Sequence, residues 1–188
     1  KGQQWALQQP AALERLANGR INLGAHCWGS GPATLCAENQ RLLPDPQLRY
    51  RLRDFPLESL AAYLPDNLAW QGEVNADLSL DFPSTGPRGT IRVDAGPGTL
   101  RMRDGEQWLE FPYAILALNS ELTPQRINSQ LRFEGGELGE LDVRLQVDPS
   151  TEAKAISGTF RLSDFNLSVA RPLLAQVEKA VGDVDVRM

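Results

Sequence analysis

Strict alternation of apolar and polar residues over long stretches is the feature that most constrains this chain. In residues 73–82 and 140–147 every second residue is apolar, and the residues between them are charged or polar. A period of two is typical of β-strands with one dry face and one wet face. A nine-residue strand of this kind carries an apolar strip roughly 30 Å long. The functional question is whether protein or an apolar ligand covers that strip.

Composition and charge narrow the class of protein. The chain has 188 residues, 41% of them hydrophobic, which is enough for one large all-β domain. A net charge of −5 argues against nucleic acid as a partner, because phosphate binding needs a concentrated basic stripe. Arg49, Arg51 and Arg53 occupy the polar phase of a strand and predict a solvated face. The longest apolar run, residues 113–118, is far shorter than the ~18 residues of a membrane span.

The two cysteines predict a disulfide. Cys27 and Cys36 flank a Gly-Ser-Gly-Pro turn, which places them opposite each other on a hairpin and within bonding reach. Closing this loop should restrict the unfolded chain by roughly 2.5 to 3 kcal/mol. A disulfide implies an oxidising compartment, whereas a pair of buried thiols in a cytosolic protein is the alternative. Zinc is not expected, because His26 would point to the opposite face from Cys27; no cofactor is expected either.

Turn residues divide the chain into predicted strands and two helices. Apolar residues at helical spacing predict short amphipathic helices over 57–64 and 167–181. Asp54 and Asp164 precede these helices, where a carboxylate caps the first amides. Turn signals bound the predicted strands at 20–28, 33–38, 47–54, 72–82, 89–95, 98–103, 107–111, 113–122, 126–134, 138–148, 154–163 and 183–188.

The chain contains an internal repeat. Residues 51–82 and 161–188 share the order strand, Asp-Phe turn, short helix, glycine and strand. Self-similarity of this kind is typical of supersecondary units stacked along one direction. The second copy begins its returning strand only at the end of the chain, and the chain starts at Lys1 without an initiator methionine. We therefore expect residues 1–188 to be a single β-rich segment of a larger protein.

One region carries a resemblance to a known family. The sequence Leu-x-Asp-Phe-x-Leu at 52–57, a short helix, and Trp-x-Gly-x-Val-x-Ala at 70–76 resemble the repeats of the TamB family, which are AsmA-like bridge proteins of Gram-negative envelopes. The resemblance implies a periplasmic segment of an inner-membrane-anchored protein that works with the outer-membrane barrel protein TamA. It also implies a long sheet bent into an open, taco-like groove with an apolar interior. Family members are linked to phospholipid transport toward the outer membrane and to assembly of autotransporters and other barrels.

The apolar strips can be arranged in two ways. They pack on each other as the core of a sandwich, or they line an open groove. Long strands, the repeat and the scarcity of large aromatic residues favour the groove, as does the resemblance. The side chains predicted to line it are Val74, Ala76, Leu78, Leu80, Phe82, Ile91, Val93, Leu100, Met102, Leu116, Leu118, Leu131, Phe133, Leu141, Val143, Leu145, Val147, Ile156, Phe160 and Leu162.

The function predicted for such a groove is to carry phospholipid acyl chains across the periplasm. Exposing a sixteen-carbon chain to water costs roughly 12 kcal/mol, at about 0.8 kcal/mol per methylene. The alternatives are a scaffold that pairs nascent outer-membrane β-strands at a sheet edge, and a passive spacer whose apolar lining is only a core.

We do not expect an enzyme. The chain has one histidine, no nucleophile elbow and no phosphate-binding glycine loop. The carboxylate pairs Glu140 with Asp142 and Asp104 with Glu106 are the only hydrolase candidates considered, and a structural role is favoured for both.

Overall fold

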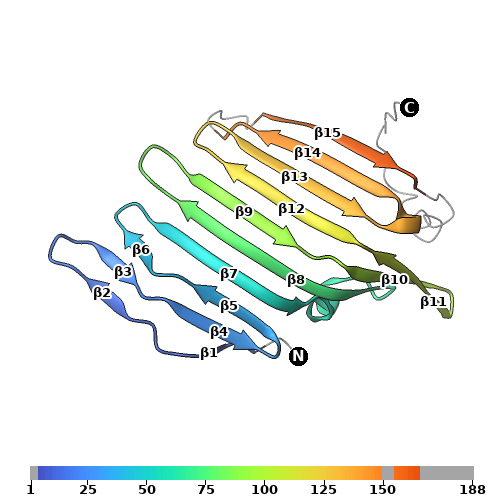
Figure 1. The fold of residues 1–188 in the computed structure, drawn as a ribbon, viewed down its shortest axis with the longest axis horizontal. Helices are drawn as coiled ribbons and strands as arrows, with labels where there is room; N and C mark the ends of the chain where they lie inside the picture. The colour runs from blue at the N-terminus through green and yellow to red at the C-terminus, as the bar shows by residue number, and fades with distance from the viewer. Residues whose placement is uncertain (1–3, 150–154, 166–188) are drawn as a thin grey trace.

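The computed structural model describes residues 4–149 and 155–165, and its strands form one antiparallel sheet that does not close (Figure 1). Two short 3-10 helices, η1 (Leu57–Tyr63) and η2 (Gly136–Leu138), interrupt the strands. The strands are β1 (Ala6–Leu7), β2 (Leu13–Arg15), β3 (Ile21–Leu23), β4 (His26–Ser30), β5 (Ala33–Ala37), β6 (Gln40–Leu43), β7 (Gln47–Pro56), β8 (Leu68–Asp81), β9 (Arg88–Asp94), β10 (Gly98–Asp104), β11 (Gln107–Tyr113), β12 (Ile115–Leu122), β13 (Ile127–Glu134), β14 (Glu140–Val147) and β15 (Ile156–Ser163).

The sheet has a main path of ten strands and forks at two places. The main order is β1-β4-β5-β7-β8-β9-β12-β13-β14-β15. At one rim β2, β3 and β6 continue the sheet beside β7, and at the other rim the β10–β11 hairpin pairs with β8 (Figure 1). Strand β8 has 14 residues, so its N-terminal part pairs with β10 and its C-terminal part with β9. This long strand joins the two parts of the sheet.

The predicted all-β class and the long open antiparallel sheet are confirmed. The predicted strand 20–28 is two strands, because the backbone at residues 24 and 25 leaves the ladder: the Gly24 N–H donates to Ala12 O and the Ala25 N–H to Asn39 Oδ1. Strands β1, β2 and β6 were not predicted, because two to four residues are too few for a periodic signal. The predicted helix at 57–64 is η1, whereas the predictions at 167–181 and 183–188 lie outside the described residues.

The capping role predicted for Asp54 is wrong. The residue that precedes η1 is Pro56, and no side chain caps the helix. Asp54 instead has φ +52° within a β-bulge, where its N–H donates to Asn75 Oδ1 at 3.2 Å. Aspartate tolerates this left-handed conformation better than most residues, and the bulge brings Phe55 back into register opposite Val74.

One structural observation bears on the predicted repeat. Asp164, which is equivalent to Asp54 in the repeat, has φ +54°. The rest of the second copy, from residue 166 onward, lies outside the described residues. The repeat therefore stays a prediction.

The predicted disulfide is confirmed. Cys27 on β4 lies directly opposite Cys36 on β5, and the two sulfurs are bonded. The bond closes the β4–β5 hairpin, which lies near one end of the sheet.

A small core anchors the rim at which β10 and β11 diverge from β9 and β12. Met102, Phe111 and Leu138 are buried there, and partly buried Leu68, Leu100 and Phe133 pack around them.

A tyrosine fixes the same junction. The buried Tyr113 hydroxyl donates to Ala95 O at 2.7 Å and accepts from Trp70 Nε1 at 2.8 Å. Its ring lies over Gly98, where a Cβ would stand 2.2 Å from the hydroxyl oxygen. Burial raises the pKa of Tyr113, so the hydroxyl keeps its proton and its donor role.

The bulge at Asp54 gives a stability prediction. We expect Asp54→Val to lower the free energy of unfolding by about 1 to 2 kcal/mol, because a β-branched residue is strained at positive φ. Asp54→Asn should have little effect, since asparagine also tolerates this conformation. Urea titrations of the purified chain measure both variants. Equal losses for valine and asparagine would show that the carboxylate matters and not the backbone conformation.

Candidate functional site

Cross-strand register turns the alternation within single strands into one continuous apolar surface. Side chains directly opposite each other on neighbouring strands lie on the same face of a sheet. One such row crosses all ten strands of the main path, and every member is apolar: Leu7, Trp28, Leu35, Leu52, Ala76, Val93, Leu118, Leu131, Val143 and Phe160. The apolar face therefore runs perpendicular to the strands along the whole sheet.

Parallel rows widen this face on both sides. Toward one rim the row is Leu48, Leu80, Gly89, Leu122, Ile127, Val147 and Ile156. Toward the other rim Leu116, Phe133, Leu141 and Leu162 lie opposite one another.

The polar groups on the apolar face have partners. Ser120 and Ser129 lie opposite each other, and their hydroxyl oxygens are 2.8 Å apart in a hydrogen bond. His26, at the β4 end, is 6% exposed, and its Nδ1 lies 2.9 Å from Gly24 O. The face therefore offers few free hydrogen-bonding groups to a ligand.

The apolar face has no second layer packed on it in residues 4–149 and 155–165. Of the side chains predicted to line a groove, only Met102 is buried; it and Leu100 belong to the small core at the rim. Leu145 is 45% exposed and Phe160 is 66% exposed, and most of the others are half-buried. The described strands form an open sheet and not a packed sandwich.

The apolar face is covered near one rim. Leu57 of η1 is 1% exposed, and its Cδ1 lies within contact of the position that a Cβ on Gly72 would take. The helix thus packs on β8 near one rim and leaves the middle of the face open.

Several residues of this face were missing from the sequence prediction. The signal that could have found those on β7 is the same alternation, because they lie between the polar-phase arginines of that strand. The omitted residues include Leu7, Trp28, Leu35, Leu48, Tyr50, Leu52, Leu122 and Ile127.

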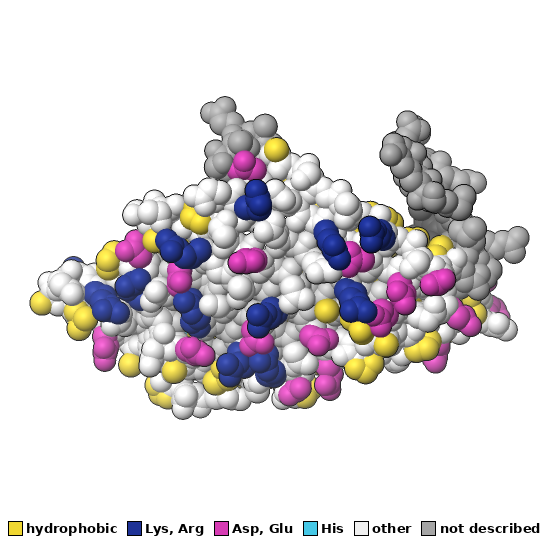
Figure 2. All heavy atoms as spheres, turned by 45° about the horizontal axis from the view of Figure 1, so that its top comes forward, with side chains coloured by type: hydrophobic (Ala, Val, Ile, Leu, Met, Phe, Trp, Pro, Cys, Tyr) yellow, Lys and Arg dark blue, Asp and Glu magenta, His cyan; other side chains and the backbone are white. Residues whose placement is uncertain are grey.

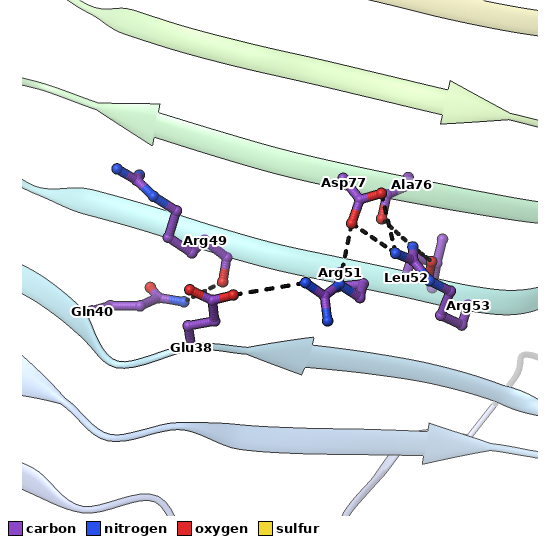
Figure 3. A network of polar contacts seen from close by, with 8 residues as sticks. All are labelled: Glu38, Gln40, Arg49, Arg51, Leu52, Arg53, Ala76 and Asp77. Carbon is purple, nitrogen blue, oxygen red and sulfur yellow. Dashed lines mark hydrogen bonds and ion pairs between the residues drawn. The ribbon is translucent and has the colours of Figure 1, made fainter.

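The opposite face of the sheet is polar. Figure 2 shows arginines and acidic residues interleaved across this face, with hydrophobic side chains mainly at its margins. Arg49 pairs with Asp81 at 2.6 Å. Arg51 and Arg53 both pair with Asp77, at 3.2 and 2.8 Å (Figure 3). The Arg53 guanidinium, and then Arg51, hold the pKa of Asp77 below its usual value. These pairs bridge β7 and β8.

A hollow of about 990 Å³ lies over β9, β12, β13, β14 and β15. Most of its lining residues belong to the polar face, including Arg92, Asn119, Gln130, Arg144 and Thr159. Such a lining suits polar ligands and not acyl chains, so the apolar face remains the candidate site for an apolar ligand.

The described residues give no sign of a metal site or a membrane-spanning helix. No group of three His, Cys, Asp or Glu side chains among them is placed to hold a metal ion. No helix among them has the length and apolarity to cross a membrane.

The fold and the site define a class of protein: an open antiparallel sheet with one continuous apolar face and one polar, charged face. A family model described as TamB, N-terminal domain, matches residues 1–188. No solved structure matches the chain. The chain therefore belongs to the TamB family and is a TamB-type envelope protein.

The charge pairs of the polar face predict a pH dependence. A lowered pKa means that Asp77 contributes stability above its ordinary pKa of about 3.9, and that this contribution is lost as pH falls through the folded-state value. Because the Asp77 side chain is 52% exposed, Asp77→Asn should cost at most about 1 kcal/mol at pH 7.

Measuring the free energy of unfolding from pH 7 down to acid pH tests this prediction. The difference in that free energy between Asp77→Asn and the parent should shrink below about pH 4. The control is Glu73→Gln on the same strand, which has no ion-pair partner among the described residues. The same pH dependence in both variants would contradict the assignment to the Arg53 and Arg51 pairs.

Proposed function

We propose that the apolar face carries phospholipid acyl chains through the periplasm, in a protein that links the inner and outer membranes and works with a TamA-like outer-membrane barrel. The observation that carries the proposal is the row of ten apolar side chains across ten strands. Family membership supports the envelope location, and the Cys27–Cys36 disulfide fits an oxidising compartment.

The energetics favour such a surface. Each methylene exposed to water costs about 0.8 kcal/mol, so a tail lying against an apolar face avoids much of the cost of crossing an aqueous space. Contacts with leucine, valine and isoleucine are non-directional, so no single position holds the tail strongly. Weak and uniform contact suits movement along the surface.

The direction of the apolar rows fits transport. Strands are spaced by about 4.8 Å, so ten strands give a continuous apolar track about 43 Å long, perpendicular to the strands. Further units of the same kind would lengthen this track and not close it. We therefore infer that lipid moves across the strands and not along them.

One observation favours a second candidate, a scaffold for nascent outer-membrane β-strands. All eight residues of β15 are exposed, and among the described strands β15 pairs with β14 alone. An exposed strand of this length offers backbone groups for strand addition. Such binding would use the edge of the sheet, whereas lipid conduction uses its apolar face.

Leu118 and Asn119 provide a matched test, because they are neighbours on β12 that face opposite sides of the sheet. A photo-crosslinking residue in place of Leu131, which lies opposite Leu118, would report lipid on the apolar face. We expect Leu118→Arg to remove most of the lipid crosslink, because it places a charge in the centre of the track. Asn119→Arg should leave the crosslink unchanged.

Circular dichroism should show the same strand content in both arginine variants. An unchanged lipid crosslink in Leu118→Arg would refute conduction over this face. Normal lipid crosslinking combined with loss of barrel assembly, when β15 is altered, would instead support the scaffold.

A further inference from the structure

The two rims of the sheet differ in charge. The connections β2–β3, β6–β7, β8–β9 and β12–β13 lie along one rim, toward the upper left of Figure 1. We call this the arginine rim, because its turns and strand ends carry Arg15, Arg20, Arg41, Arg88 and Arg126, with Glu14, Asp45, Asp81 and Asp148. Acidic residues predominate at the opposite rim, namely Asp54, Glu58, Asp66, Asp104, Glu106, Glu137 and Asp164.

The rim arginines differ from those within the polar face. Among the described residues, none of the five forms an ion pair, whereas Arg49, Arg51, Arg53, Arg101, Arg132 and Arg144 all do. Where the rim side chains have partners, these are neutral. Nε of Arg20 donates to Asn22 Oδ1 at 3.1 Å, Nε of Arg41 to Asp45 O at 3.0 Å, and Nη2 of Arg88 to Thr85 Oγ1 at 3.0 Å. A guanidinium has five N–H donors, so these contacts leave most of them available to an anion.

Two of these arginines line the same hollow. It measures about 450 Å³ and lies between the β2–β3 hairpin and β6–β7. Arg20 and Arg41 contribute to its lining, and Glu14, Asn22 and Gln47 do so as well. Register gives the arrangement: Glu14, Asn22, Arg41 and Gln47 form one row across β2, β3, β6 and β7.

We propose that this hollow binds the headgroup of a zwitterionic phospholipid whose phosphate contacts Arg20 and Arg41 and whose primary ammonium faces Glu14. Guanidinium groups match phosphate oxygens with paired N–H donors, and the Glu14 carboxylate can accept the N–H donors of a primary ammonium. The proposal rests on the proposed function, because it takes the bound lipid to be cargo of the apolar face.

The position of the hollow suits an amphipathic ligand. Apolar side chains are exposed at the same rim, including Leu13 at 68% and Leu43 at 51%. Leu13 alternates along β2 with Glu14 of the hollow, so the polar and apolar faces meet at this hairpin. A phospholipid joins an anionic group to apolar chains over the same short distance. Its headgroup and its tails can therefore contact the two faces across this rim.

The remaining rim arginines extend the same chemistry. Arg41 and Arg88 line a neighbouring hollow of about 260 Å³, together with Asp45 and Asp81. Successive turns along the rim are two strands apart, about 9.5 Å, which is comparable to the width of a lipid with two chains. Arg88 and Arg126 thus provide further positively charged positions along the direction proposed for lipid movement.

Lipid competition tests the proposal on the purified chain. The chain is mixed with equal amounts of phosphatidylethanolamine and phosphatidylcholine, which share the phosphate but differ in N–H donors, and bound lipid is identified by native mass spectrometry. We expect the ethanolamine lipid to be preferred, and Glu14→Gln to remove most of this preference. The double variant Arg20→Gln with Arg41→Gln should reduce lipid retention roughly tenfold, because charge-assisted contacts to phosphate are lost.

The control is Arg92→Gln, which removes an arginine from the polar face away from this hollow and should change neither result. Equal binding of the two lipids by the parent chain, or retention unaffected by the double variant, would overturn the headgroup site. Equal competition by inorganic phosphate would also overturn it, because a free anion would then account for the binding. Lipid crosslinking at Leu131 separates the two proposals. If the parent chain forms the crosslink but shows no headgroup preference, only the headgroup site at the rim is refuted. If neither the parent nor any variant forms the lipid crosslink, conduction over the apolar face is refuted.

Discussion

Cross-strand register is the constraint on which the rest of the structure depends. Backbone hydrogen bonds fix which residues lie opposite each other, and a slip of one residue would move every apolar side chain of a strand to the other face. Ten strands nevertheless keep one apolar row continuous from Leu7 to Phe160. The bulge at Asp54 belongs to the same constraint, because it absorbs extra backbone before Phe55 and keeps that side chain opposite Val74.

An open sheet needs support that a sandwich obtains from its second layer. Here that support is distributed over the two faces and the rims. Arginine–carboxylate pairs bridge neighbouring strands on the polar face, the disulfide closes the β4–β5 hairpin, and the cluster around Met102 anchors the fork at β10. Each contribution is modest, but together they leave the apolar face free. The proposed ligand surface is therefore a consequence of where the stabilising contacts lie.

Sequence reasoning succeeded where a physical period was long enough to detect. The alternation at 138–148 predicted β14 closely, and that at 72–82 predicted β8 except for its first four residues. The turn between Cys27 and Cys36 predicted their disulfide. It failed for the short strands β1, β2 and β6, which have two to four residues each and are held in place by pairing with neighbouring strands. It also failed for Asp54, because an aspartate before a helical segment has the same sequence signature whether it caps the helix or forms a left-handed bulge.

The sequence by itself determined that the chain forms strands with one apolar and one polar side, because side-chain alternation is a local property of extended backbone. It could not determine that these sides join into one face, or that the face stays free of a second layer. Those outcomes depend on register between strands far apart in the chain and on the order in which they pair. The same pairing between strands brought Glu14, Arg20 and Arg41 together at one hollow, which no spacing along the chain predicts.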